Sequence, residues 1–296
     1  MIDLIIPYYN NPKGIITTLQ SINFDIFNVT IIDDGSNNYL PPTIFGAQVF
    51  RYNDNRGPGR ARQWGIEHTS NPYIMFIDTG DEFISQEVQL EIPYMIDEYS
   101  DSDIIVWSYL HDEKITNFLD NRLHGKLYKR KFLTEKGITF CPNSSYMNED
   151  IGFNRACRLL TDNKIAFIDK PLIHQIKEEN SLTEKDSKAA LYRDQTRSLS
   201  LVSIHTLETC DKNNVNTDIE INQIAIALYY WFIRCAAERP EYLPDAWAGA
   251  KIFYDYCKDK INPNNLWVGS TALKRCLMYK DKIKFPINVL RFAHDI

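Results

Sequence analysis

Short apolar runs alternate with amphipathic segments along the first 180 residues. Short apolar runs of three to seven residues are typical of strands buried on both faces of a parallel sheet. They occur at residues 4–6, 29–32, 49–52, 73–77, 103–109 and 165–168. Helical patterns lie between them at 13–21, 57–68, 85–99, 126–136 and 148–160. The alternation predicts a doubly wound α/β fold with a mixed, mainly parallel sheet.

Beyond residue 184 the strand pattern disappears and helical periodicity takes over. Helices are predicted at 189–208, 219–237, 244–258 and 271–279. We therefore expect two domains, an α/β domain over 1–183 and a helical region over 184–296.

Acidic and glycine residues follow two of the buried runs. Asp33-Asp34-Gly35-Ser36 closes the second run, and Asp78-Thr79-Gly80-Asp81 closes the fourth. Ligands of such sheets bind at the carboxyl ends of the strands. A carboxylate there can accept the N3 hydrogen of uracil or bind ribose hydroxyls, although Asp and Gly also favour plain turns. Asp78 and Asp81 are oxygen ligands of the kind that Mg²⁺ or Mn²⁺ takes, and the alternative is a capped turn.

Two further segments carry chemistry. Residues 55–63 form a glycine loop with Arg60 and Arg62, which can pair with a diphosphate or be solvated. Glu149-Asp150 precedes a predicted helix, whose positive end is expected to lower the pKa of Asp150 and keep it ionised. An ionised Asp150 can act as a general base, and a simple helix N-cap is the alternative.

In this order the segments resemble family 2 glycosyltransferases, over about the first 183 residues. The matching stretches are Ile5-Ile6-Pro7-Tyr8-Tyr9-Asn10, Ile32-Asp33-Asp34-Gly35-Ser36, Ala61-Arg62, Phe76-Ile77-Asp78-Thr79-Gly80-Asp81, Gly125-Lys126-Leu127-Tyr128-Lys129-Arg130, Glu149-Asp150 and Asn180-Ser181-Leu182-Thr183. The resemblance implies a GT-A fold, a nucleotide-sugar donor, inversion at the anomeric carbon and a divalent cation, Mn²⁺ or Mg²⁺.

The same resemblance implies roles for single residues. The donor, a UDP-sugar, would be bound by Pro7, Tyr9, Asp33, Asp34, Arg62 and Asp78. Asp78 and Asp81 would hold the metal, and Asp150 would deprotonate the acceptor with Glu149 beside it. The family commonly has an acid where this chain has Gly80, so either Asp81 takes over or fewer carboxylates hold the metal. His174 is a further candidate contact, although a lone histidine is more often structural.

Composition limits the class of protein. The 296 residues are 44% hydrophobic and 24% charged, enough for a sizeable core, and the net charge of −6 is atypical of nucleic-acid binders. Six cysteines without metal-ligand spacing predict free thiols in a reducing compartment. The longest apolar run, 224–235, is too short to span a bilayer, and the N-terminus lacks a leader pattern. We therefore expect a soluble, cytoplasmic protein, in the host cytoplasm if the source is a phage.

The acceptor is harder to predict from the sequence than the donor. Basic residues gather at 122–131 and 274–291, where they can bind a nucleic-acid backbone or an anionic membrane surface; for either cluster alone, solvated helix faces are the preferred interpretation. We expect Lys126, Lys129 and Arg130, together with the helical region, to contact the acceptor. The N-terminal segment and the overall size also resemble phage enzymes that add a sugar to modified cytosine in DNA. The first hypothesis is therefore that the acceptor is the sugar on glucosylated hydroxymethylcytosine.

Two alternatives stay open. The first is a bacterial surface-polysaccharide enzyme with a glycan or lipid-linked acceptor. The second is a non-catalytic nucleotide-sugar-binding module, which the intact Asp78, Asp81 and Asp150 disfavour. Sugar nucleotidyltransferases are disfavoured because Pro7-Tyr8-Tyr9-Asn10 stands in place of their glycine-rich loop.

Overall fold

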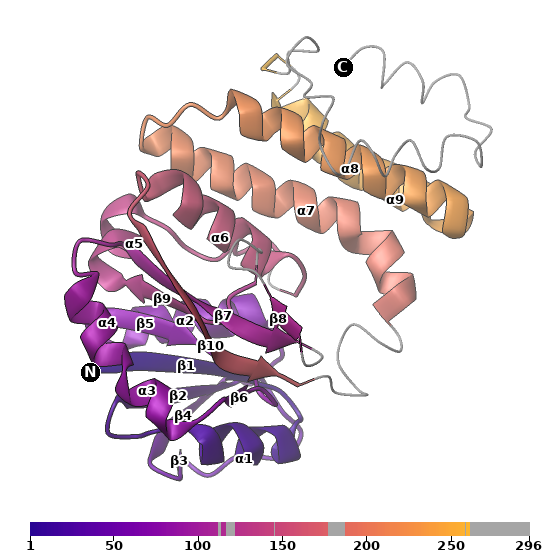
Figure 1. Ribbon diagram of the computed structural model, residues 1–296. Coiled ribbons are helices and arrows are strands. Elements are labelled where there is room, and N and C mark those ends of the chain that lie inside the picture. Colours follow the sequence, from indigo (N-terminus) through magenta and orange to yellow (C-terminus); the bar gives the residue numbers. More distant parts are fainter. Residues whose placement is uncertain (112–113, 117–121, 145, 177–186, 258, 261–296) are drawn as a thin grey trace. The chain divides into compact units, whose positions relative to one another are not determined.

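A computed structural model describes residues 1–111, 114–116, 122–144, 146–176, 187–257 and 259–260 (Figure 1). The chain divides into two compact units, Met1–Glu179 and Asn180–Ile296. The boundary predicted from the sequence lies four residues further along the chain.

The first unit is built on one large, mainly parallel sheet. Its strands lie in the order β3-β4-β2-β1-β5-β9-β7-β10-β6, and β8 pairs with β7. β1, β2, β4 and β5 run parallel to one another, whereas β9 is antiparallel to both of its neighbours. The bounds are β1 Ile2–Tyr8, β2 Phe27–Asp33, β3 Thr43–Ile44, β4 Ala47–Arg51, β5 Tyr73–Phe76, β6 Glu82–Phe83, β7 Ile104–His111, β8 Lys114–Thr116, β9 Lys126–Lys129 and β10 Ile165–Gln175. The predicted α/β class is confirmed.

Helices cover both faces of this sheet because β1 is apolar on both. Alternate residues of β1, among them Leu4 and Ile6, share a core with Ile15 and Leu19 of the first helix. Ile5 faces the other way, against Gly65, where an added Cβ would lie 2.5 Å from the isoleucine side chain. The helices of this unit are α1 Pro12–Ser21, α2 Pro58–His68, α3 Gln86–Leu90, α4 Ile92–Glu98, α5 Arg130–Lys136 and α6 Glu149–Leu160.

Two of the predicted helices are wrong in detail. The segment 126–136 begins as strand β9 and becomes α5 only at Arg130. The stretch 85–99 is split into α3 and α4 at Glu91, one residue before the Ile92-Pro93 start of α4, because proline has no N–H to continue a helix. The short strands β3, β6 and β8 carry too few residues for a periodic signal and were not predicted.

The second unit is helical over its described residues. It contains α7 Ser187–Lys212, α8 Asp218–Glu238, the 3₁₀ turn η1 Pro240–Tyr242 and α9 Leu243–Cys257. α7 meets α9 through small side chains, since Thr196 and Ser200 donate hydrogen bonds to the carbonyls of Ala246 and Gly249. The predicted helix 271–279 and the basic stretch 274–291 lie outside the described residues.

The described residues include five of the six cysteines and the longest apolar run, 224–235. The five cysteines among them are free and buried. None of the described helices combines the length and the apolar character needed to cross a membrane.

Candidate active site

The carboxyl edge of the sheet gathers most of the predicted site. β1, β2 and β5 end there, at Tyr8, Asp33 and Phe76. Because β9 runs antiparallel to β5, it begins at this edge and ends at the opposite one. The segment just before β9 therefore lies beside the segments that follow β1, β2 and β5.

The turn after β5 places two carboxylates together. The Asp81 N–H donates to the Asp78 carbonyl at 3.1 Å, which closes a tight turn over residues 78–81. Gly80 has φ 105°, a conformation that side chains disfavour, and its N–H donates to Thr18 Oγ1 at 2.9 Å. The glycine at the position where the family carries an acid thus shapes the turn that brings Asp81 to Asp78.

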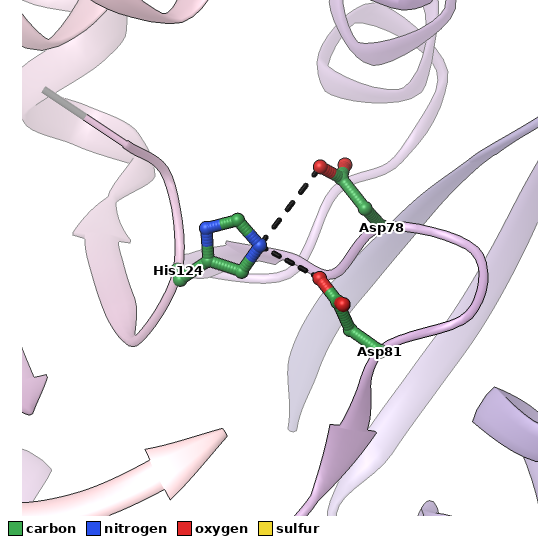
Figure 2. A group of neighbouring side chains, drawn as sticks. All are labelled: Asp78, Asp81 and His124. Carbon is green, nitrogen blue, oxygen red and sulfur yellow. Dashed lines mark hydrogen bonds and ion pairs between the residues drawn. The ribbon is translucent and has the colours of Figure 1, made fainter. Parts of the chain in front are cut away.

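His124 completes this group and was not predicted as a site residue. Its Nε2 lies 2.7 Å from Asp81 Oδ2 and 3.9 Å from Asp78 Oδ2 (Figure 2). One ligand atom from each of the three residues lies within 4.8 Å of the others, close enough to share one metal ion. His174, the histidine considered from the sequence, pairs instead with Glu82 in the ladder between β10 and β6.

The three side chains also shift one another's protonation. Burial raises the pKa of Asp81 despite its hydrogen bond to His124. Burial opposes ionisation of Asp78 too, but the charges of Arg62 and His124 outweigh it and lower the pKa of Asp78. The imidazole pKa of His124 is raised by Asp81 and Asp78, against its own burial.

Arg62 links the acidic turn to the start of α6. Its side chain is only 5% exposed, and it projects from α2. Nη2 donates to Asp78 Oδ1 at 2.5 Å and Nη1 donates to Glu149 Oε1 at 2.9 Å. Nε is buried without a hydrogen-bond partner among the described residues. Both η nitrogens therefore bind protein carboxylates, so a direct contact of Arg62 with a diphosphate stays a prediction.

Glu149 and Asp150 form the first turn of α6, after Asn148 in the left-handed region at φ 58°. The expectation of a lowered pKa for Asp150 is wrong. Burial raises the pKa of Asp150 and outweighs both the Arg62 charge and the hydrogen bond from the Ile151 N–H. Burial also raises the pKa of Glu149 to about 7, with Asp150 adding to the rise and Arg62 opposing it. A carboxyl with a raised pKa is better suited to accept a proton near neutral pH.

The two aspartates after β2 are both engaged by the protein. Asp33 is fully buried, and its carboxylate accepts from Ser36 N at 2.9 Å and from Arg51 Nη1 at 2.5 Å. Asp34 accepts from the backbone N–H groups of Arg56 at 2.8 Å and Gly57 at 2.7 Å. Burial raises the pKa of Asp34 although these two bonds oppose the rise. Asp33 therefore fixes its own turn, while Asp34 holds the glycine loop against the end of β2.

Pro7 and Tyr9 stand at the end of β1. The Pro7 carbonyl accepts from Thr79 Oγ1 at 2.7 Å, which attaches β1 to the acidic turn. The Tyr9 side chain is 46% exposed and is available to a ligand. Asp78 is a second predicted donor residue with an open side chain, which is 42% exposed.

The predicted acceptor residues are not brought together. Lys126 is buried at the start of β9, and its Nζ donates to the Arg122 carbonyl. Lys129, at the other end of β9, donates to Ser100 O at 2.6 Å. Arg130 reaches Asp3 at the start of β1, with Nη2 2.7 Å from Asp3 Oδ2. The antiparallel course of β9 thus carries Lys129 and Arg130 to the amino edge, away from Asp78 and Asp150.

Solved structures of known proteins share this fold. The S. aureus TarS 1–349 complex with UDP is 16% identical, with a TM-score of 0.56 over 96% of this chain and 93% of that one. The TarS 1–349 complex with UDP-GlcNAc is 18% identical, with a TM-score of 0.54 over 87% and 92%. The Pyrobaculum calidifontis mannosyltransferase PcManGT, in complex with GDP-Man and Mn²⁺, is 12% identical, with a TM-score of 0.51 over 99% and 83%.

Sequence relatives cover less of the chain. A Rickettsia bellii protein described as an uncharacterized glycosyltransferase is 29% identical over 102 residues, 32% of this chain and 15% of that protein. A Rickettsia felis protein with the same description is 30% identical over 102 residues, 32% of this chain and 17% of that protein. This chain therefore matches only a small part of the length of these relatives.

The family assignment comes from a longer match. The sequence profile described as glycosyl transferase family 2 matches residues 3–156. That range runs from the first strand through the acidic turn and Glu149-Asp150 into α6, and it is slightly more than half of the chain. The chain therefore belongs to glycosyl transferase family 2.

Proposed function

We propose that this protein transfers a sugar from a UDP-sugar to an acceptor hydroxyl with inversion at the anomeric carbon. The observation that carries the proposal is the grouping of Asp78, Asp81 and His124 with Glu149 and Asp150, joined through Arg62, at the carboxyl edge of the sheet. The TarS complexes with UDP and UDP-GlcNAc support a uridine donor by likeness of fold.

The site carries more negative than positive charge. Four carboxylates, those of Asp78, Asp81, Glu149 and Asp150, lie with the guanidinium of Arg62 and the imidazole of His124, and the charge of Arg122 also reaches His124. A diphosphate adds further negative charge, so a divalent cation is needed to make the complex favourable. Two carboxylates and an imidazole suit Mn²⁺, which accepts oxygen and nitrogen ligands. When bound there, the ion would neutralise the charge on the departing nucleoside diphosphate.

Asp150 supplies the base in this proposal. The acceptor hydroxyl gives its proton to the Asp150 carboxylate while its oxygen forms a bond to the anomeric carbon. The bond from that carbon to the diphosphate oxygen breaks, and UDP leaves with the electron pair. Arg62 keeps Glu149, and with it the first turn of α6, beside the acidic turn.

We infer that the accepting group is a sugar hydroxyl. Both acceptors considered from the sequence, glucosylated DNA and a polysaccharide, present one. The described residues offer little support for DNA, because Lys126 is buried and Arg130 is bound to Asp3. The glycan acceptor is therefore the first to test.

A UDP-release assay with UDP-glucose or UDP-GlcNAc and Mn²⁺ tests the proposal. The assay is run in parallel with glycan acceptors, with glucosylated hydroxymethylcytosine DNA and with unmodified DNA. The Asp150→Asn variant is the inactive control. We expect release stimulated by a glycan and lost in the variant. Release stimulated only by the modified DNA would replace the glycan acceptor with DNA. Release that is equal in the Asp150→Asn variant would reject Asp150 as the base.

A further inference from the structure

One exposed tyrosine joins the two halves of the candidate site. Tyr146 lies three residues before α6, and its side chain is 56% exposed. Its hydroxyl donates a hydrogen bond of 2.6 Å to the backbone carbonyl of Asn55, 91 residues earlier in the chain. This contact attaches the segment before α6 to the loop at Asn55, in addition to the Arg62–Glu149 contact further along each segment.

The Asn55 side of this contact belongs to the nucleoside end of the site. The next two residues, Arg56 and Gly57, donate their backbone N–H groups to the Asp34 carboxylate at 2.8 and 2.7 Å. Tyr146 thus contacts the loop that is attached to Asp34. Its pKa is raised by partial burial and then by the charges of Asp34 and Asp54, which agrees with this location.

The other side of the contact leads directly to the proposed base. From Tyr146 the chain passes Met147 and the left-handed Asn148 into Glu149 and Asp150. Glu149 is held from the opposite direction by Arg62. The first turn of α6 is therefore fixed at two points, through Arg62 to the acidic turn and through Tyr146 to the loop attached to Asp34.

We propose that Tyr146 is a positioning residue that couples occupancy of the nucleoside end to the placement of Asp150. The exposed ring, tied to the loop that is attached to Asp34, also offers a surface on which the donor base can stack. This inference rests on the proposed function. It assigns to Tyr146 two separable contributions, the hydroxyl for placing α6 and the ring for binding the donor.

Hydrogen exchange of the full chain without ligand tests the connection itself. Tyr146→Phe removes only the hydroxyl. The exchange rate of the amides at 55–57 and 149–152 is expected to rise about fivefold, because one hydrogen bond is lost. Tyr94→Phe, at a 72% exposed position on α4, is the control and should change neither segment. Unchanged exchange in Tyr146→Phe would overturn the connection whatever the protein binds.

Kinetics and calorimetry test the two contributions. For Tyr146→Phe we expect kcat of UDP-sugar hydrolysis to fall about fivefold, with the Kd of UDP within twofold of wild type. Tyr146→Ala should in addition weaken UDP binding by about tenfold, because the stacking surface is lost. A changed exchange pattern with an unchanged kcat would overturn the positioning role. Wild-type protein that binds no UDP would instead reject the proposed function, and the unliganded exchange result would show which idea failed.

Discussion

Two arginines at opposite ends of the same sheet, Arg62 buried and Arg130 half-buried, differ in how completely they are bound. Arg130, at the amino edge, donates from Nε to Asn71 O at 2.7 Å and from Nη1 to Ile66 O at 2.5 Å. Its Nη2 donates to Asp3 Oδ2 and to Thr69 Oγ1, each at 2.7 Å. Every nitrogen of this guanidinium therefore has a protein acceptor, three of the four being neutral.

Arg62, at the carboxyl edge, is bound only by acids. It has one hydrogen bond to each of Asp78 and Glu149, and its Nε has no partner among the described residues. Asp81 and Asp150 add further carboxyls close by, and burial raises the pKa of both. Here the charges do not balance, and the acids are costly to keep ionised.

The difference separates structure from function. An ion pair with all its donors used and its carboxylate fully buried, such as Arg130 with Asp3, ties strands together and leaves nothing for a ligand. A buried group with surplus negative charge and an unused donor is stable only because something else binds there or because some acids are protonated. Substitutions at the amino edge should therefore mainly lower stability, and substitutions at the carboxyl edge should mainly lower activity.

The largest expected effect is on catalysis at the carboxyl edge. Asp150→Asn removes the proton acceptor but keeps the size of the side chain, so transfer should fall by about 100-fold to 10,000-fold. The melting temperature and the Kd for UDP should stay near wild type. Initial rates, thermal unfolding and calorimetric titration measure the three quantities. A large loss of donor affinity would contradict the role given to Asp150.

The matched change at the amino edge should act on stability. Asp3→Asn leaves the Arg130 charge without its carboxylate, and breaking a buried pair in this way costs about 3–5 kcal/mol of unfolding free energy. Denaturant unfolding measures the loss. The folded fraction should still bind UDP, because Asp3 lies at the edge opposite to the site. Unchanged stability in Asp3→Asn would contradict the structural role of the Arg130 network.

Metal binding should distinguish substitutions at the amino edge from those at the carboxyl edge. A saturating cation, at about 100 times its Kd, stabilises the folded state by about 2.7 kcal/mol. Mn²⁺ should therefore raise the melting temperature of the wild type. It should raise that of Asp3→Asn by a similar amount, and that of Asp78→Asn little or not at all. An equal shift in the Asp78→Asn protein would reject Asp78 as a ligand.

The smallest expected effect is a pH dependence of stability at Glu149. Its pKa in the folded protein is raised from 4.5 to about 7, mainly by burial. The folded state therefore binds a proton more tightly than the unfolded state, and the stability from this group is fully present below pH 4.5 and lost as pH rises through 7. Denaturant unfolding from pH 5 to 8 without metal should show wild type losing stability relative to Glu149→Gln. The exposed Glu98→Gln serves as the control and should follow wild type.

The sequence was sufficient for the parts of the site that follow buried parallel strands. Apolar runs ending in acids placed Asp34 and Asp78 correctly at the carboxyl edge, because all parallel strands of a sheet end on the same side. The helix beginning at Glu149 was also predicted, since its apolar positions recur with helical spacing. These features depend on local pattern alone.

The direction of β9 could not be predicted in that way. Lys126-Leu127-Tyr128-Lys129 is too short to separate strand from helix, and a local pattern does not show whether a strand runs with or against its neighbours. That one direction decides that His124 joins the acids and that Arg130 joins Asp3. The raised pKa of Asp150 was missed for a related reason, because burial is a property of the assembled sheet and helices.

The central claim is that the site carries more negative than positive charge and therefore binds UDP together with a cation. The most direct test is a calorimetric titration of UDP into the full chain, with Mn²⁺ and with a chelator. The account predicts that UDP binds in the presence of Mn²⁺ and at least about tenfold more weakly without it, because the diphosphate otherwise meets four carboxyls that Arg62 and His124 compensate only in part. Equal affinity in the two conditions would contradict it, and would mean that Arg62 and the backbone alone bind the diphosphate.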